Sequence, residues 1–232
     1  AVATGHHAQI VQHNGAWFVG RGHDPTKDQS YVVHMLPQRE LARTMFPIGH
    51  LTKVQVREKA TALGLRTAAK PDSQDVCFIT DGGGRVAFLG SRIPFRSARV
   101  IDAVDGAELG TVDALEMVTL GQRRGIGLAG GGPKRFVVGL DYQTPTVIVG
   151  DESLLQSESI AVRNLVWAHE PVVGSVAVQC SAHGNAMLGS LAPNEQQVTV
   201  TWDSPQRRVA PGQSVVFYDP SNRYVLGGGV AV

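Results

Sequence analysis

Cysteine is scarce in this sequence, and long apolar runs are absent from it. Only Cys77 and Cys180 occur among 232 residues, and their separation fits no metal-ligand spacing, so no bound metal is expected. Two cysteines in a chain of this length favour a reducing compartment, the cytoplasm, over a disulfide framework. No apolar stretch approaches the roughly 18 residues of a membrane span, so we expect no membrane partner.

The sequence also lacks an excess of charge of either sign. Twenty-one lysines and arginines oppose twenty aspartates and glutamates, which leaves a net charge of +1. Such a balance does not predict nucleic-acid binding by itself. Any RNA site in this chain would therefore have to be a local basic patch.

The first third of the chain mixes strand and helix patterns. Gln9–Gln12 and Trp17–Gly20 read as strands, and the Asn14-Gly15 pair between them predicts a hairpin. Helices are expected further on, at residues 29–36, 37–46 and 52–64. An apolar strand ending at Gly5, followed by helices, fits an α/β domain whose earlier strands are missing, so we expect a fragment of a longer protein.

Beyond residue 81 the pattern becomes mostly strand and turn. Short strands are expected at residues 99–103, 136–140 and 146–149. Residues 125–130 match a dinucleotide-binding fingerprint, but glycines, a proline and a strand pattern follow them instead of the required helix, so a flexible loop is expected. The last stretch has strand patterns at 159–167, 175–180, 197–203, 214–218 and 223–225. Their short spacing predicts a small closed barrel.

Seven short segments together carry a family resemblance. They are Ala3-Thr4-Gly5-His6, Lys27-Asp28-Gln29-Ser30-Tyr31, Phe46-Pro47-Ile48-Gly49, residues 70–79 (KPDSQDVCFI), residues 119–125 (TLGQRRG), Pro211-Gly212-Gln213-Ser214 and Leu226-Gly227-Gly228-Gly229. In order and spacing these segments resemble the tRNA-uridine 2-sulfurtransferase (tRNA-specific 2-thiouridylase) family. The resemblance implies three parts: an α/β remnant of an adenylating, PP-loop-type Rossmann-like domain (residues 1–80), a small mixed central domain that contacts tRNA (81–152), and a C-terminal all-β barrel (153–232).

The resemblance also implies a chemistry, the ATP-dependent 2-thiolation of the wobble uridine of tRNA. In this family ATP adenylates the C2 oxygen, and a cysteine persulfide then delivers sulfur to that carbon as AMP leaves. Adenylation converts a poor leaving group into a good one, and a persulfide is a strong soft nucleophile. The implied partners are tRNA and a sulfur-donor protein, either a cysteine desulfurase or a relay protein. ATP is the implied cosubstrate, and no bound cofactor is expected.

Three residues receive roles at the reacting centre from the resemblance. Cys77 matches the persulfide cysteine, Gly5 a nucleotide contact and His6 an RNA contact. Taken alone, Cys77 also fits a buried structural thiol, and Gly5-His6 also fits a strand end followed by a surface histidine. Cys180 matches no family role and is expected in the core of a strand.

Further tRNA contacts are implied outside the reacting centre. They fall on Lys27, Asp28, Gln29, His183, Gly184 and Gln213, of which His183-Gly184 stands where the family commonly has an Arg-Tyr pair. A lysine can meet a phosphate and a glutamine can bond a base edge. The same residues also allow a helix start at 27–29 and a polar turn at Gln213. The basic Gln122-Arg123-Arg124 suits backbone phosphates or an ordinary surface turn.

Two parts of the family pattern are not found in the sequence. They are a phosphate-binding loop of the form Ser-Gly-Gly-x-Asp-Ser and a second catalytic cysteine, which in the family precedes the Ala-Thr-Gly-His strand. We therefore expect this chain alone not to catalyse thiolation. A non-catalytic tRNA-binding module is the main alternative. A tRNA methyltransferase, a name the family has also carried, is less favoured because no adenosylmethionine-type loop is found.

Overall fold

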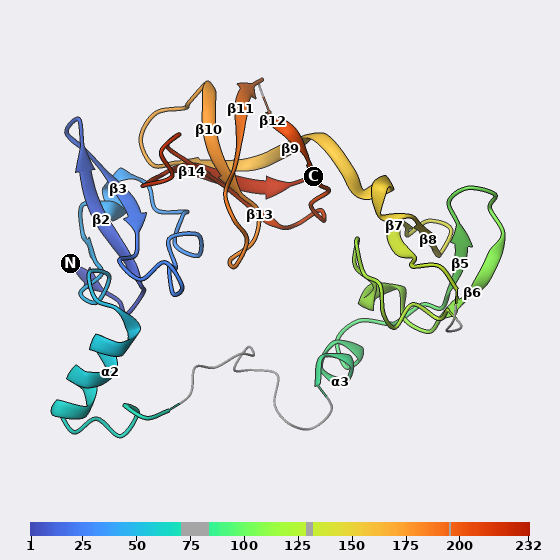
Figure 1. Ribbon diagram of the computed structural model, residues 1–232, viewed down its shortest axis with the longest axis horizontal. Coiled ribbons are helices and arrows are strands. Elements are labelled where there is room, and N and C mark those ends of the chain that lie inside the picture. The colour runs from blue at the N-terminus through green and yellow to red at the C-terminus, as the bar shows by residue number, and fades with distance from the viewer. Residues whose placement is uncertain (71–83, 129–131, 195) are drawn as a thin grey trace. The chain divides into compact units, whose positions relative to one another are not determined.

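The computed structural model describes residues 1–70, 84–128, 132–194 and 196–232, which divide into two compact units (Figure 1). Residues 1–70 and 157–232 form one unit, and residues 71–156 form the other. The two ends of the chain therefore fold together. Among the described residues, no helix has the length and apolarity that crossing a membrane would require.

A β-hairpin dominates the N-terminal segment. Strands β2 (Ala8–His13) and β3 (Ala16–Arg21) pair antiparallel across Asn14 and Gly15, whose φ angles are 49° and 81°. Two positive φ values are what a tight hairpin turn needs, so the hairpin predicted from Asn-Gly is confirmed. The short strands β1 (Val2–Ala3) and β4 (Thr44–Met45) pair parallel beside it.

Of the three helices expected in this segment, one is confirmed. Helix α2 (Lys53–Ala62) begins after Thr52, whose hydroxyl and Gln55 form a capping box. The expected helix at 37–46 shortens to α1 (Gln38–Leu41) because the chain then enters β4. The helix expected at 29–36 is wrong: this stretch is a series of turns. Gln29, its first residue, is hydrogen-bonded to His7 through both its backbone and its side chain.

The C-terminal segment is a closed six-stranded barrel, as predicted. Its strand order is β10-β11-β12-β9-β14-β13. The bounds are β9 Gln156–Trp167, β10 Gly174–Gln179, β11 Met187–Pro193, β12 Val198–Arg207, β13 Ser214–Tyr218 and β14 Val225–Ala231. Strand β11 was not predicted, because exposed apolar residues and a glycine interrupt its alternation. The interior is filled by a cluster of valines with Leu191, Trp202 and Phe217.

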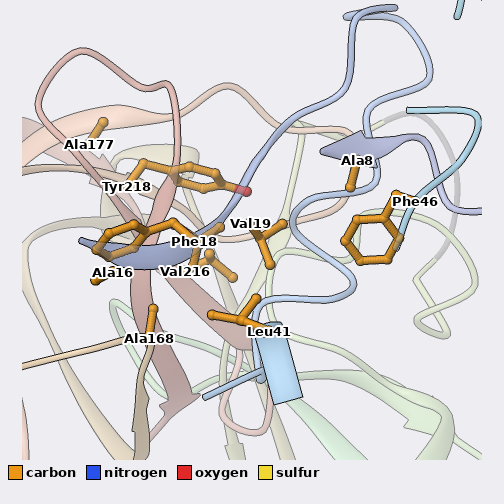
Figure 2. Close-up of a cluster of buried hydrophobic side chains, with 11 residues drawn as sticks. Ala8, Ala16, Phe18, Val19, Leu41, Phe46, Ala168, Ala177, Val216 and Tyr218 are labelled. Carbon is orange, nitrogen blue, oxygen red and sulfur yellow. The ribbon is translucent and has the colours of Figure 1, made fainter. Parts of the chain in front are cut away.

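Strand β13 is buried on both of its faces. Val215 and Phe217 point into the barrel core, whereas Val216 and Tyr218 pack in a second cluster with the hairpin residues Phe18 and Val19. Figure 2 shows this second cluster, in which side chains of the hairpin and of the barrel exterior meet. The N-terminal hairpin therefore covers one outer face of the barrel. A double burial of this kind explains the continuous apolar run in β13.

The turns after Gln29 dock on the barrel through specific contacts. The Tyr31 hydroxyl donates to the backbone oxygen of Ser214 at 2.9 Å. His34 is buried, and its Nδ1 lies 2.7 Å from the Tyr31 carbonyl oxygen. Its ring lies against β14 at Gly228, where an added Cβ would come within 2.7 Å of His34 Cδ2 and of the Val215 carbonyl oxygen. Only glycine fits there, because both neighbours approach the backbone closely.

The second unit is a four-stranded sheet in the order β6-β5-β8-β7. Its elements are α3 Gly84–Gly90, β5 Ala98–Asp102, β6 Glu108–Val112, the 3₁₀ helix η1 Leu115–Met117, β7 Phe136–Asp141, β8 Thr146–Gly150 and the 3₁₀ helix η2 Glu152–Leu155. The three predicted strands are confirmed, and β6 and α3 were missed. No helix follows Gly125 within the described residues up to Leu128, which agrees with rejection of the dinucleotide fingerprint.

Replacement of Gly228 by alanine is expected to destabilise the first unit by about 1–3 kcal/mol, the usual cost of overpacking. The added methyl group must displace either the His34 ring or the backbone of β13. Urea unfolding followed by tryptophan fluorescence measures this, because all three tryptophans (Trp17, Trp167 and Trp202) lie in that unit. Gly5→Ala is the control, since Gly5 lies in the same unit and a Cβ there meets nothing within 4 Å. Equal midpoints for both variants would contradict the docking described for His34.

Candidate functional site

Gly5 and His6 follow β1 on an open part of the surface. Gly5 is exposed, and a Cβ there would meet no atom within 4 Å, so the space beside its backbone can admit a ligand. His6 is half-buried: its Nδ1 lies 2.8 Å from Thr4 Oγ1, and its ring meets Phe46 edge-on with centroids 6.1 Å apart. The histidine is thus held in place while part of its ring faces solvent.

Gln29 lies beside this strand end, although 22 residues separate it from His7. The His7 amide donates to Gln29 Oε1 at 2.9 Å, and the Gln29 amide donates to the His7 carbonyl oxygen at 2.8 Å. The structure therefore brings the predicted contacts His6 and Gln29 together. One lone pair of the Gln29 side-chain oxygen is used by His7, and the side-chain N–H groups are the donors that Gln29 can offer to a base edge.

Asp28 is turned inward. Its Oδ1 accepts from the Gly22 amide at 2.6 Å and the Ser30 amide at 3.3 Å. Its Oδ2 accepts from the Ser30 hydroxyl at 2.7 Å and from Arg21 at 2.8 Å, and the side chain is only 10% exposed. A carboxylate with four donors is already satisfied. Its geometry favours a structural role, that of holding residues 22–30 in one conformation.

Asp24 ties the same loop to helix α2. Its Oδ2 accepts from the Lys53 amide at 3.0 Å, and its Oδ1 accepts from the Thr26 amide and hydroxyl. The hydrogen bond from the Lys53 backbone is the main cause that lowers the pKa of Asp24 below its ordinary value. The Lys27 amide donates to the Asp24 carbonyl oxygen at 3.0 Å, so Asp24 also positions the half-buried Lys27.

The barrel residues with predicted tRNA contacts lie on two turns. His183 and Gly184 are exposed in the connection between β10 and β11, where the Gly184 amide donates to the Ser181 carbonyl oxygen at 3.2 Å. Gln213 is exposed in the turn before β13, and its amide donates to the Ala210 carbonyl oxygen at 3.2 Å. Both turns are fixed by backbone hydrogen bonds and present their side chains to solvent.

Of the two cysteines, only Cys180 lies within the residues that the structure describes. Cys77, the predicted persulfide carrier, lies outside the described residues. Cys180 was expected in the core of a strand; it lies just after β10 and is partly buried, packed against the barrel core. Burial raises the pKa of its thiol to about 12. Cys180 is therefore protonated at neutral pH and unsuited to nucleophilic attack.

Other features of the described residues give weaker evidence for a functional site. The basic loop residues Arg123 and Arg124 are exposed in the second unit, and Gln122 Nε2 donates to the Arg124 carbonyl oxygen at 2.8 Å, as in an ordinary turn. A pocket of about 550 Å³ opens beside the hairpin, lined by Gln9, Ile10, Trp17, Leu41, Ala42, Thr44, Met45, Phe46, Pro47 and His50. It contains none of the predicted site residues. Within the part of the chain that the structure describes, no group of metal-ligating side chains could hold a metal ion.

Sequence reasoning missed Arg21, which proves central to the loop. Its guanidinium lies over the Tyr218 ring, 3.6 Å from the centroid, and bonds Asp28. Burial raises the pKa of Tyr218 to about 12, and its hydroxyl lies 3.0 Å from Ser30 Oγ. The two glycines that flank Arg21 could have drawn attention to this position. Its partners could not be predicted, because most of them come from distant parts of the chain.

Comparison with known proteins covers nearly all of the chain. Residues 1–81 match a family model described as the tRNA methyl transferase HUP domain. Residues 86–151 match the tRNA methyl transferase PRC-barrel domain, and residues 157–231 match the aminomethyltransferase beta-barrel domain. The matches follow one another in the order of the α/β segment, the central sheet and the closed barrel.

Three similar relatives carry the same name and show similar identity to this chain. A protein of Heliobacterium modesticaldum is 38% identical over 100% of this chain, one of Corynebacterium diphtheriae is 40% identical over 99%, and one of Chloroflexus aggregans is 41% identical over 99%. Each bears the name tRNA-specific 2-thiouridylase. This chain spans 61%, 65% and 64% of their respective lengths.

The lowered pKa of Asp24 predicts a pH-dependent contribution to stability. Because its folded pKa lies below the unfolded value of about 4, its stabilising effect is present above that value and is lost as the pH falls through the folded pKa. Asp24→Asn is therefore expected to lower the urea midpoint at pH 7 and to match the unaltered chain at the acid end. A midpoint difference that stays constant down to pH 3 would contradict this role for the carboxylate.

Proposed function

Because the chain belongs to the tRNA-specific 2-thiouridylase family, we propose that it takes part in the ATP-dependent 2-thiolation of the wobble uridine of tRNA. The observation that carries this proposal is the similarity to these enzymes over the whole chain. The position of Gln29 beside His6, next to the open backbone of Gly5, supports it further. Residues implied to touch nucleotide and RNA would then share one surface.

The proposed reaction has two stages. ATP first adenylates the C2 oxygen of the uridine, and pyrophosphate leaves. The terminal sulfur of a persulfide on Cys77 then attacks C2, and the C–O bond breaks so that AMP departs with the former uridine oxygen. A second thiol attacks the Cys77 sulfur of the remaining S–S bond, which releases the 2-thiouridine and leaves a disulfide. The sulfur itself would come from a donor protein, and the thiol chemistry fits a reducing cytoplasm.

Binding roles follow from the exposure of the candidate residues. Gly5 would lie against the nucleotide, where a side chain would intrude on the space its backbone leaves open. His6, Lys27 and Gln29 would meet the RNA near the target base, through ring, ammonium and amide N–H groups. Asp28 would act by holding the loop, since its oxygens are occupied.

The exposed barrel turns supply a second part of the proposed tRNA surface. His183, Gly184 and Gln213 lie on these turns, away from the buried strands of the barrel. Contacts from such turns would bind the RNA without taking part in the transfer of sulfur. This division of roles leaves Cys77 as the residue that carries the chemistry.

The test is intact mass spectrometry of the chain after incubation with a cysteine desulfurase and cysteine. A gain of one sulfur atom that a reductant removes is expected, and it should disappear in Cys77→Ser. The matched control is Cys180→Ser, which should keep the gain because the partly buried Cys180 thiol, whose pKa is raised to about 12, is protonated. A gain that survives in Cys77→Ser, or no gain at all, contradicts the assignment of sulfur transfer to Cys77. Unchanged tRNA binding without any gain would favour the non-catalytic alternative.

A further inference from the structure

Arg21 connects the loop of residues 22–30 to the barrel. One terminal nitrogen of its guanidinium donates to Asp28 Oδ2 at 2.8 Å and to Gln179 Oε1 at 2.7 Å. The other donates to the side-chain oxygen of Asn222, in the turn between β13 and β14. The plane of the group lies on the Tyr218 ring. A single side chain, 22% exposed, thus joins the hairpin to three places on the barrel or its loops.

Gln179 extends this connection to the β10–β11 turn. It is buried at the end of β10, and its Nε2 donates to the Ser181 carbonyl oxygen at 2.8 Å. The Gly184 amide donates to the same oxygen at 3.2 Å. The side chain of Gln179 therefore accepts from Arg21 at one end and fixes the turn that carries His183 and Gly184 at the other.

We propose that Arg21 and Gln179 form a positioning relay that sets two tRNA-contacting loops, residues 22–30 and residues 181–186, in one fixed arrangement. This inference rests on the proposed function. The relay runs Asp28–Arg21–Gln179–Ser181. Its central hydrogen bond joins Arg21 and Gln179, which are 158 residues apart in the sequence. Neither relay residue needs to touch RNA, since each acts by holding a loop that does.

The chemistry of the relay suits this task. The guanidinium is a planar fork with fixed donor directions, so it can hold Asp28, Gln179 and Asn222 while its plane lies on the Tyr218 ring. A lysine ammonium is a compact point charge without this planar fork. Its charge is balanced by Asp28, so the relay adds no net charge to the interface. The ligand it serves is a folded RNA that presents phosphates to one loop and a phosphate or base edge to the other.

Double-mutant cycles on tRNA binding test the relay. The affinity of the 232-residue chain for a fluorescein-labelled tRNA transcript with a wobble uridine is measured by anisotropy. Lys27→Ala and His183→Ala are each expected to weaken binding about two- to fivefold, the range of an exposed charged contact. Both are then repeated in the backgrounds Gln179→Glu and Arg21→Lys. Unfolding curves of every variant report whether it is folded.

The two backgrounds make different predictions. In the Gln179→Glu background the side chain still accepts from Arg21 but cannot donate to the Ser181 carbonyl oxygen. The His183→Ala effect should therefore vanish while the Lys27→Ala effect persists. Arg21→Lys releases both loops, so both effects should shrink. Arg163→Lys is the matched control, because Arg163 donates to Gln197 elsewhere on the barrel surface and should leave both effects intact.

The outcomes separate the relay from a general loss of stability. A purely structural role lowers the unfolding midpoint but leaves the effects of Lys27→Ala and His183→Ala unchanged in folded variants, and that result overturns the relay. If the unaltered chain does not bind the tRNA, the proposed function itself is overturned, and the relay with it. Binding together with additive effects leaves the proposed function standing and removes the relay alone.

Discussion

The burial of strand β13 on both faces is the constraint on which the first unit depends. Val215 and Phe217 complete the barrel core, while Val216 and Tyr218 complete the cluster beneath the N-terminal hairpin. A barrel with this strand would expose an apolar stripe if the hairpin were removed. Conversely, an isolated two-stranded hairpin is marginally stable in water. Each end of the chain therefore stabilises the other, and the candidate site lies on the structure that they form together.

Polar contacts at the edge of this apolar cluster hold residues 22–30 in a defined conformation. The Tyr218 hydroxyl meets Ser30, and its ring supports Arg21, which holds Asp28. The strand end at His7 then fixes Gln29. These contacts order residues 22–30 without regular secondary structure, leaving His6 half-exposed and Gly5 open. Binding residues are commonly carried by loops that a rigid scaffold holds in place, and this arrangement is consistent with the proposed RNA contacts.

Much of the fold could be predicted from local sequence signals. The hairpin followed from Asn14-Gly15, helix α2 from its Thr52 cap, and the barrel from short strands with regular turns. The turns at 29–36 could not be predicted, because their shape is set by contacts with His7 and β13 rather than by helical propensity. The relay from Arg21 to Gln179 could not be predicted from the sequence either, because the two residues become neighbours only in the folded chain. The role of Cys77 remains a prediction from family resemblance.

Native-state hydrogen exchange followed by mass spectrometry tests the central claim, that the two ends of the chain form one cooperative structure. Peptides covering β2–β3 and β13–β14 should exchange with the same opening free energy, because neither segment can open without exposing their shared core. A hairpin that exchanges far more readily than an intact barrel would show that the two fold independently, and would contradict the account.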